Sequence, residues 1–137
     1  MLFRSKHALE AASEALAQEV FASGIRVAIV EPGVVLTPIF KKAKRFTSPE
    51  SPYAMHVRRL LLLYQLVKTP SQPEDAARVI YEAALGERRT LRHFVGEDAR
   101  KVIAGRARVS DDDYVATGGE MTEDAFVDLN RRRYGFE

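Results

Sequence analysis

The segment GIRVAIVEPGVVLT, residues 24–37, decides how this chain folds. Its centre, residues 26–30, is a short apolar run with Gly24 before it and Pro32-Gly33 after it. Strands that are buried on both faces of a parallel sheet read as such runs between turn residues. We therefore predict a strand over residues 26–30 that is buried on both faces and ends at a Pro-Gly turn.

A helix is predicted immediately before this strand. Residues 5–23 contain neither proline nor glycine, are rich in alanine, and place Leu9, Ala12, Leu16 and Val20 on one stripe at helical spacing. A helix that leads into a two-faced apolar strand is half of a crossover between parallel strands. The fold class predicted from these two segments is α/β.

The remaining segments continue the same pattern. Ser71 and Glu74 have capping-box spacing, and Pro73 suits the first turn of a helix that continues to Gly86. The buried face of this capped helix is expected at Val79, Ile80, Ala83 and Ala84. Before it, we expect an irregular loop over residues 37–52 and a helix over 53–66 with a buried apolar face at 60–67. After it, we expect a second strand over 91–95, a short helix over 98–104, and a peripheral tail beyond residue 110 that is partly helical over 122–131.

Composition excludes several classes of protein. The 137 residues include 21 basic and 19 acidic side chains, a balance too even to predict a nucleic-acid or membrane-surface protein. The absence of cysteine excludes disulfides and fits a reducing compartment, so a cytoplasmic location is expected. No apolar run approaches the length of about 20 residues that a membrane-spanning helix needs. We interpret the basic run at 41–45 as solvated loop charge rather than a phosphate or nucleic-acid site.

Two stretches together resemble the short-chain dehydrogenase/reductases (SDRs): SKHALE at residues 5–10 and PGVVLT at residues 32–37. In that family, a Tyr-x-x-x-Lys motif lies on a helix, and the next strand ends in Pro-Gly-x-x-x-Thr. Lys6 and Pro32 have the family's separation. The helix that begins at Pro73 and the strand over 91–95 also follow the family's C-terminal order, so the resemblance covers residues 1–104.

The resemblance implies an incomplete Rossmann-like, doubly wound parallel sheet. Residues 1–110 would be the C-terminal part of an SDR domain and residues 111–137 a peripheral tail. The family's first five strands, its glycine-rich βαβ turn, its catalytic serine and its helical asparagine would all precede Met1. Gly118-Gly119 is no substitute for that turn, because it follows no predicted strand.

The resemblance also assigns site residues. Lys6 matches the catalytic lysine, which binds the nicotinamide ribose and lowers the pKa of the family's tyrosine. Pro32, Gly33, Val35 and Thr37 match the cofactor-contacting turn, with the Val35 backbone and the Thr37 hydroxyl near the nicotinamide carboxamide. The alternatives are a solvated lysine in a first turn and an ordinary strand-ending turn.

Leu2 departs from the family at the decisive position. The family places its proton-transferring tyrosine there, and leucine has no ionisable group. Histidines at 7, 56 and 93 have no carboxylate or cysteine at ligand spacing, so no metal site is predicted. We expect NAD or NADP as the family's cofactor, without binding or turnover by the isolated chain.

Partners follow from the same resemblance. The family's substrate would be a small apolar alcohol or carbonyl compound, and Phe40, Phe46, Tyr53 and residues 60–63 could form an apolar wall for it. Core packing would explain the leucines at 60–63 equally well. Full-length relatives would be homo-oligomers that pair through the helix beginning at Ser5. No nucleic-acid partner is expected.

Two parallel strands alone form a ribbon too small to be stable, with an apolar edge and an alanine face exposed on the first helix. Three hypotheses remain open. The chain could be a truncated, inactive part of an oxidoreductase, or a non-enzymatic interaction module that completes its sheet with a partner or a second copy. It could also be a small independent α/β protein whose tail covers the edge.

Overall fold

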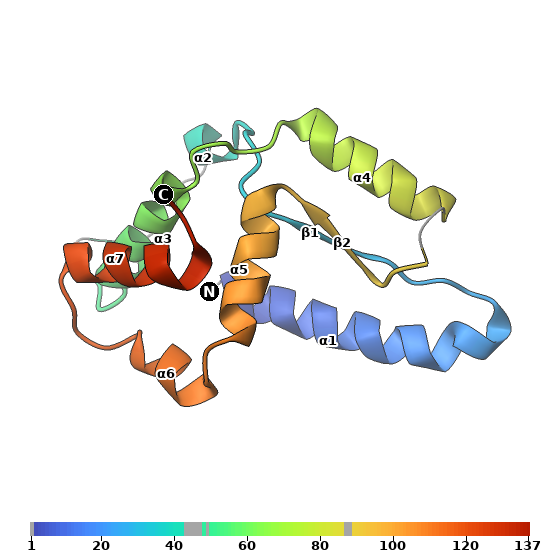
Figure 1. The fold of residues 1–137 in the computed structure, drawn as a ribbon, viewed down its shortest axis with the longest axis horizontal. Coiled ribbons are helices and arrows are strands. Elements are labelled where there is room, and N and C mark those ends of the chain that lie inside the picture. Colours follow the sequence, from blue (N-terminus) through green and yellow to red (C-terminus); the bar gives the residue numbers. More distant parts are fainter. Residues whose placement is uncertain (1, 43–47, 49, 87–88) are drawn as a thin grey trace.

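In a computed structural model, two short parallel strands, β1 (Ile29–Pro32) and β2 (Arg92–Val95), lie in the middle of the molecule (Figure 1). The structure describes residues 2–42, 48, 50–86 and 89–137, with the backbone alone at 2–4, 40 and 41. Ile29 is paired with Arg92 and Pro32 with Val95. The α/β class and the parallel pairing predicted from the sequence are confirmed.

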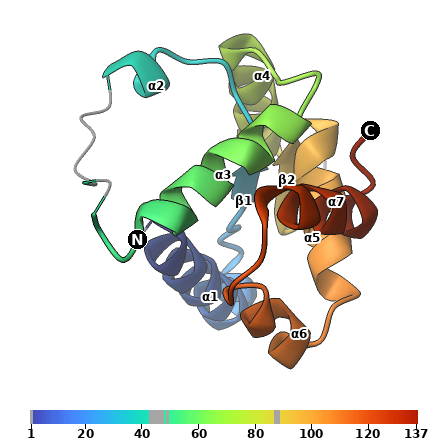
Figure 2. The same ribbon diagram turned by 90° about the vertical axis from the view of Figure 1, so that its left-hand side faces the viewer.

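Seven helices accompany the strands in the described residues, and α4 and α5 pack against the sheet (Figures 1 and 2). Their bounds are α1 Leu2–Val20, continued by a 3-10 turn Phe21–Ser23, α2 Ile39–Lys42, α3 Ala54–Leu66, α4 Pro73–Leu85, α5 Glu97–Ala107, α6 Asp111–Ala116 and α7 Glu123–Tyr134. The helices predicted over 5–23, 53–66 and 98–104 are confirmed as α1, α3 and α5, and the helix predicted over 122–131 is α7. The loop prediction over 37–52 is wrong at α2, which forms one helical turn there.

The first strand differs from its prediction in position and in burial. It begins at Ile29 rather than at residue 26 and includes Pro32, whose missing N–H is tolerated at a strand end. Residues 29–31 are half-buried and Pro32 is exposed, whereas Val95 of β2 is 1% exposed. The prediction of a strand buried on both faces is therefore wrong for β1, because α4 is the one helix of the described residues that packs substantially against it.

The start of α4 lies one residue later than the predicted capping box. The N-cap is Gln72, whose backbone N–H donates to the Asp75 carboxylate at 2.9 Å. Ser71 stays extended because its backbone bridges to the chain after β1, donating to the Val34 carbonyl and accepting from the Leu36 N–H, each at 2.9 Å. The helix ends at Gly86 as predicted, with φ 78°.

Only part of each predicted apolar face is buried. On α4, Ala83 is buried and Val79 half-buried, but Ile80 and Ala84 are exposed. On α3, Leu66 is buried and Leu61 is exposed. The predicted stripes therefore mark helices correctly while overstating how much of each helix is covered.

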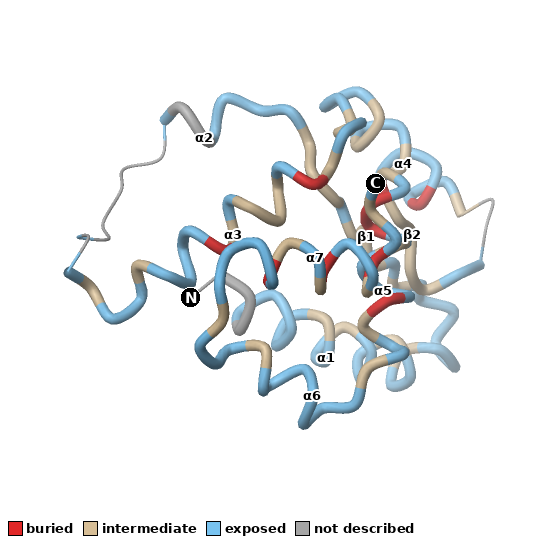
Figure 3. The backbone as a smooth tube through the Cα atoms, turned by 60° about the vertical axis from the view of Figure 1, so that its left-hand side comes forward, coloured by how far each residue is buried: buried red, intermediate tan, exposed pale blue. Residues whose placement is uncertain are grey.

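The buried residues lie mainly on α3, β2, α5 and α7 (Figure 3). Helix α7 packs against α3 and α5, so residues near the C-terminus contribute to the core. The division of the chain at residue 110 stays a prediction. The buried side chains are Arg59, Leu66, Ala83, Val95, Asp98, Ala99, Phe126, Asn130 and Tyr134.

Helix α1 has no buried side chain among its described residues (Figure 3). Leu9 is 60% exposed and Leu16 47%, and the alanine face, predicted to be open to water, is exposed at Ala8, Ala11 and Ala15. The half-buried positions form a neighbouring stripe, namely Glu10, Ser13, Ala17 and Val20. Ion pairs from Arg92 of β2 to Glu10 and Glu14 attach this helix to the sheet.

The molecule exposes more surface than its mass requires. Its accessible surface is 10572 Å² at 15.4 kDa, whereas a compact monomer of that mass exposes roughly 7000 Å². Exposed apolar side chains on and after α1, including Phe21 and Ile25, contribute to the excess. No helix in the described part of the chain is long and apolar enough to cross a membrane.

Candidate functional site

The predicted site residues lie at one end of the sheet. Both strands end there because they are parallel, and α1 begins at the same end because it runs opposite to β1 (Figure 1). Lys6 is an exposed residue near the start of α1, and Pro32-Gly33 follows directly from β1. The structure therefore brings Lys6 and the Pro-Gly turn to the same end of the molecule from two different elements.

Hydrogen bonds on two sides hold the turn after β1. The Gly33 N–H donates to the Val95 carbonyl at 2.9 Å, and the Val34 N–H donates to the Asp98 Oδ2 at 2.6 Å. On the other side, Ser71 binds the Val34 carbonyl and the Leu36 N–H. The backbone of residues 33–36 is thus fixed between the start of α5 and the start of α4.

This arrangement leaves the backbone of Val35 unpaired. In a trans peptide the C=O and the following N–H point in opposite directions, and the described residues contain no cis bond. Because the Val34 carbonyl points to Ser71, the Val35 N–H points away from Ser71. Because the Leu36 N–H also points to Ser71, the Val35 C=O points away too. Neither Val35 group has a hydrogen-bond partner within the described residues.

The other predicted positions are less constrained. Thr37 is exposed, and neither its hydroxyl nor the Lys6 ammonium group has a hydrogen bond or ion pair within the described part of the chain. Leu2 begins α1 one turn before Lys6. Its side chain lies outside the described residues.

The predicted apolar wall is not assembled in the described residues. Tyr53 is exposed beside His56, and residues 60–63 are half-buried on α3 apart from the exposed Leu61. The Phe40 side chain and Phe46 lie outside the described residues, as does most of the basic run at 41–45. Burial raises the pKa of Tyr64, which also lies on α3.

Sequence reasoning missed Asp98, the buried carboxylate that binds the Val34 N–H. It lies in the first turn of α5 and is 7% exposed. A Cβ atom on Gly33 would lie 2.2 Å from its Oδ2, and a Cβ on Gly96 would lie 2.4 Å from its Oδ1. The two glycines beside Asp98 were visible in the sequence and were part of the signal. Each was interpreted as a turn residue, and not as a position that leaves space for a neighbouring side chain.

Two surface hollows lie away from these residues. One, of about 1030 Å³, lies beside the C-terminal end of α1 and the start of β2, where Phe21, Arg26 and Leu91 line it. The other, of about 590 Å³, lies between α5, α6 and α7, with Arg108 and Arg132 at its wall. Neither is lined by a predicted cofactor residue, so we place the candidate site at the turn after β1.

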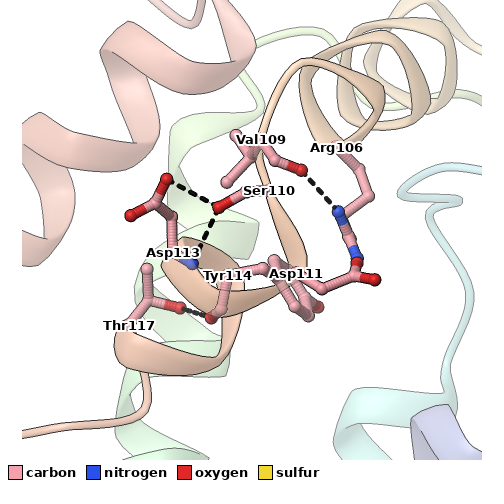
Figure 4. A network of polar contacts seen from close by, with 7 residues as sticks. All are labelled: Arg106, Val109, Ser110, Asp111, Asp113, Tyr114 and Thr117. Atoms are coloured by element: carbon pink, nitrogen blue, oxygen red, sulfur yellow. Dashed lines mark hydrogen bonds and ion pairs between the residues drawn. The ribbon is translucent and has the colours of Figure 1, made fainter.

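The polar network beside the second hollow has a structural role (Figure 4). Ser110 caps α6: its Oγ accepts from the Asp113 N–H at 3.1 Å and donates to the Asp113 Oδ2 at 2.7 Å. Arg106 binds the Val109 carbonyl at 2.9 Å and the Asp111 carboxylate. These bonds fix the connection from α5 to α6. No group of histidine, aspartate and glutamate side chains suited to a metal ion occurs among the described residues.

Comparison with known proteins finds similarity to parts of three longer proteins. No family model matches the chain, and no solved structure matches it. It is 31% identical over 118 residues to each of two Schizosaccharomyces pombe proteins named uncharacterized oxidoreductases, an alignment that covers 85% of this chain and 50% of each relative. It is also 31% identical over 109 residues to the uncharacterized oxidoreductase YusZ of Bacillus subtilis, covering 75% of this chain and 39% of that protein.

The chain therefore spans about half the length of these relatives or less. Each of the three relatives is named an oxidoreductase, and no reaction, substrate or cofactor is part of the names. The similarity shows that this chain resembles part of proteins that are named oxidoreductases.

Proposed function

We propose that this chain carries the nicotinamide-contacting part of an NAD(P)-dependent oxidoreductase of the SDR type. Its two strands would be the C-terminal strands of a Rossmann-like sheet. The observation that carries the proposal is the unpaired backbone of Val35 at the carboxyl end of β1. Ligands of open α/β sheets bind outside the carboxyl ends of the strands, and the relatives' names agree with the class of reaction.

The Val35 backbone suits a carboxamide. Its N–H and C=O point to the same side, and a primary amide offers both a donor and an acceptor. In the proposed site these groups bind the nicotinamide carboxamide, with Thr37 beside them, while Pro32 and Gly33 set the turn. Lys6, from α1, binds the nicotinamide ribose. The proposed substrate is a small apolar alcohol or carbonyl compound.

In this proposal, the chain does not transfer hydride by itself. Leu2 cannot give or take a proton, and no glycine-rich turn that could hold a pyrophosphate follows β1 or β2. We propose that a further polypeptide segment supplies both the missing strands and that turn. Such a segment would pack against the exposed face of α1 and against the edge of β1 that has no partner strand in the described residues.

The test uses half of the cofactor, because the proposal assigns only the nicotinamide half to this chain. Reduced nicotinamide mononucleotide is titrated at millimolar concentrations into the ¹⁵N-labelled chain, and AMP is the control for the other half. We expect amide shifts confined to Gly33, Val35 and Thr37 with the nicotinamide compound. Equal shifts with AMP, or none with either compound, would contradict the proposal.

Substitution of Lys6 sharpens this test. Lys6→Met should weaken the response to nicotinamide mononucleotide, because the ribose contact is lost while the Val35 contact remains. Lys68→Met is the matched control, since Lys68 is also exposed but lies after α3. Equal responses in both variants would remove Lys6 from the site.

A second function, a non-enzymatic interaction module, is favoured by the surface area. The excess over a compact monomer, on the order of 3000 Å², is comparable to the area that stable protein interfaces bury. In this alternative, a partner protein or a second copy covers α1 and pairs with β1. Light scattering decides it: complexes of defined size support the module, and a well-folded monomer that remains single at high concentration rules out self-pairing.

A further inference from the structure

Asp98 lies where three separate segments meet. It belongs to α5, it binds the Val34 N–H that follows β1, and it lies beside Gly96, which follows β2. The hydroxyl of Ser71 also approaches this point: a Cβ on Gly96 would lie 2.8 Å from the Ser71 Oγ and 2.4 Å from the Asp98 Oδ1. The Asp98 carboxylate therefore lies against the ends of both strands, and the Ser71 hydroxyl approaches the same point from the other side of Gly96.

The backbone is adapted to this carboxylate at two glycines. Gly33 has no positive φ, so its backbone conformation is open to other residues; what excludes them is the carboxylate, 2.2 Å from the position of a Cβ. Gly96 has φ 88° and a second clash with the same carboxylate. The close approach of Asp98 thus explains Gly33, and at position 96 it adds to the positive φ that already favours glycine.

The two oxygens of Asp98 are unequal. Oδ2 accepts the Val34 N–H at 2.6 Å, a short bond to a charged acceptor. Oδ1 is buried and has no hydrogen-bond partner among the described residues. The first turn of α5 presents free N–H groups and the positive end of the helix dipole, which favour a negative charge there. A buried carboxylate that leaves one oxygen unpaired costs stability, which argues for a role other than stabilising the fold.

We propose that Asp98 is the positioning residue of the nicotinamide-contacting turn. It fixes the peptide before Val34, while Ser71 fixes the peptides on either side of Val35, so that the N–H and C=O of Val35 are presented together. This inference rests on the proposed function for its ligand. Its mechanism, the hold of Asp98 on Val34, stands on the geometry alone and can be tested without a cofactor.

Amide hydrogen exchange of the full chain tests that hold. Asp98→Ala should speed exchange at Val34 by about tenfold, the factor expected when one hydrogen bond is lost. Leu36, bound to the Ser71 carbonyl, is the internal reference. Asp98→Asn keeps an acceptor oxygen and should preserve most of the protection. Glu97→Ala, an exposed acidic residue in the same helical turn, is the matched control and should change nothing at Val34.

A double-mutant cycle tests the close packing. Gly33→Ala should lower the thermal midpoint because its methyl group meets the carboxylate. Asp98→Ala in that background should restore part of the loss, since it removes every atom named in the clash. Effects that simply add, or an unchanged Val34 exchange rate in Asp98→Ala, would overturn the proposal. A similar rise in exchange at Leu66 and Phe126 would also overturn it, by showing general loosening of the fold.

Titration of the Asp98 variants with reduced nicotinamide mononucleotide separates this inference from the proposed function. In Asp98→Ala, the Val35 and Thr37 shifts caused by reduced nicotinamide mononucleotide should be lost, while Asp98→Asn retains them. If the wild-type chain shows no such shifts, the proposed function fails, and Val34 exchange still decides whether Asp98 positions the turn. If the wild-type shifts persist unchanged in Asp98→Ala, the proposed function stands and the positioning role is refuted.

Discussion

The guanidinium of Arg59 lies over the ring of Phe126, with its Cζ 5.2 Å from the ring centroid. Arg59 is 5% exposed and donates to the carbonyls of Thr117, Gly119 and Met121 at 2.9 to 3.2 Å. No carboxylate pairs with it in the described residues. Backbone dipoles and one aromatic face therefore hold a buried cation that joins α3 to the segment leading into α7.

Arg59→Ala should lower the free energy of unfolding by about 2 to 4 kcal/mol, because three carbonyls lose their donor and a buried space opens. Arg59→Lys should recover only part of this, since an ammonium group does not reproduce the planar fork of donors. Urea denaturation measures both changes, and amide exchange should show α7 loosening first.

The neighbouring Arg58 provides the control. It is exposed and forms an ion pair with Glu123, and this hydrogen bond raises the pKa of Arg58 and lowers that of Glu123. Exposed pairs contribute little to stability, so Arg58→Ala should leave the urea midpoint unchanged. Equal losses in the Arg58 and Arg59 variants would show that burial does not distinguish them.

The position of Arg59 was available in the sequence, but the interpretation of residues 60–67 overlooked it. Arg59, Leu62 and Leu66 are spaced at i, i+3 and i+7, so they share one side of α3. Leu66 is buried and Leu62 half-buried. A charged residue in line with an apolar stripe was therefore the signal for a buried arginine, whereas its partners, distant in sequence, could not be predicted.

Local signals predicted the elements better than their contacts. Gly24 ends the 3-10 turn that continues α1, and Gly86 ends α4, each with positive φ, as their sequence positions indicated. The helical period of α1 was correct, but it could not show which stripe would face the sheet. That choice depends on Arg92, which lies far along the chain. Asp98 escaped prediction for the same reason, since its partner Val34 is 64 residues away.

Arg92→Met should release α1 from the sheet. Burial acts to lower the pKa of Arg92, but hydrogen bonds and attraction from Glu31 and Glu14 outweigh it, so the pKa is raised. Without the guanidinium, the ion pairs from β2 to α1 are lost, and amides in α1 should exchange faster while those in α7 do not change.

The salt dependence of amide exchange in α1 gives a second test of the same prediction. Added salt should loosen α1 in the wild type, because screening weakens partly exposed ion pairs, and should have little effect in Arg92→Met. Arg78→Met is the control, since Arg78 pairs with Asp75 and Glu82 inside α4. If the amides of α1 keep their protection from exchange in Arg92→Met, contacts other than those of Arg92 attach α1 to the sheet.

Acid should remove the contribution of Asp75 to the start of α4. The Gln72 N–H, and then Arg78, lower the pKa of Asp75 below its ordinary value of 3.8. A lowered folded-state pKa means that the stabilisation is complete above the unfolded pKa and is lost as the pH falls through the folded one. The difference in thermal midpoint between wild type and Asp75→Ala should therefore be present at neutral pH and shrink below about pH 3 to 4. A difference that stays constant into acid would show that the charge of Asp75 contributes nothing.

A phenol introduced at position 2 should not by itself create an enzyme. Hydride transfer in the proposed reaction needs a proton donor near Lys6 and a cofactor held by its pyrophosphate, and Leu2→Tyr supplies only the first. We expect neither the wild type nor Leu2→Tyr to oxidise NADH or NADPH with small apolar aldehydes or ketones, as followed by the absorbance of the reduced nicotinamide. We also expect no submillimolar binding of either cofactor by calorimetry. Turnover by Leu2→Tyr would show that the nicotinamide half of the site suffices to hold a cofactor, and turnover by the wild type would show that a proton donor other than residue 2 acts there.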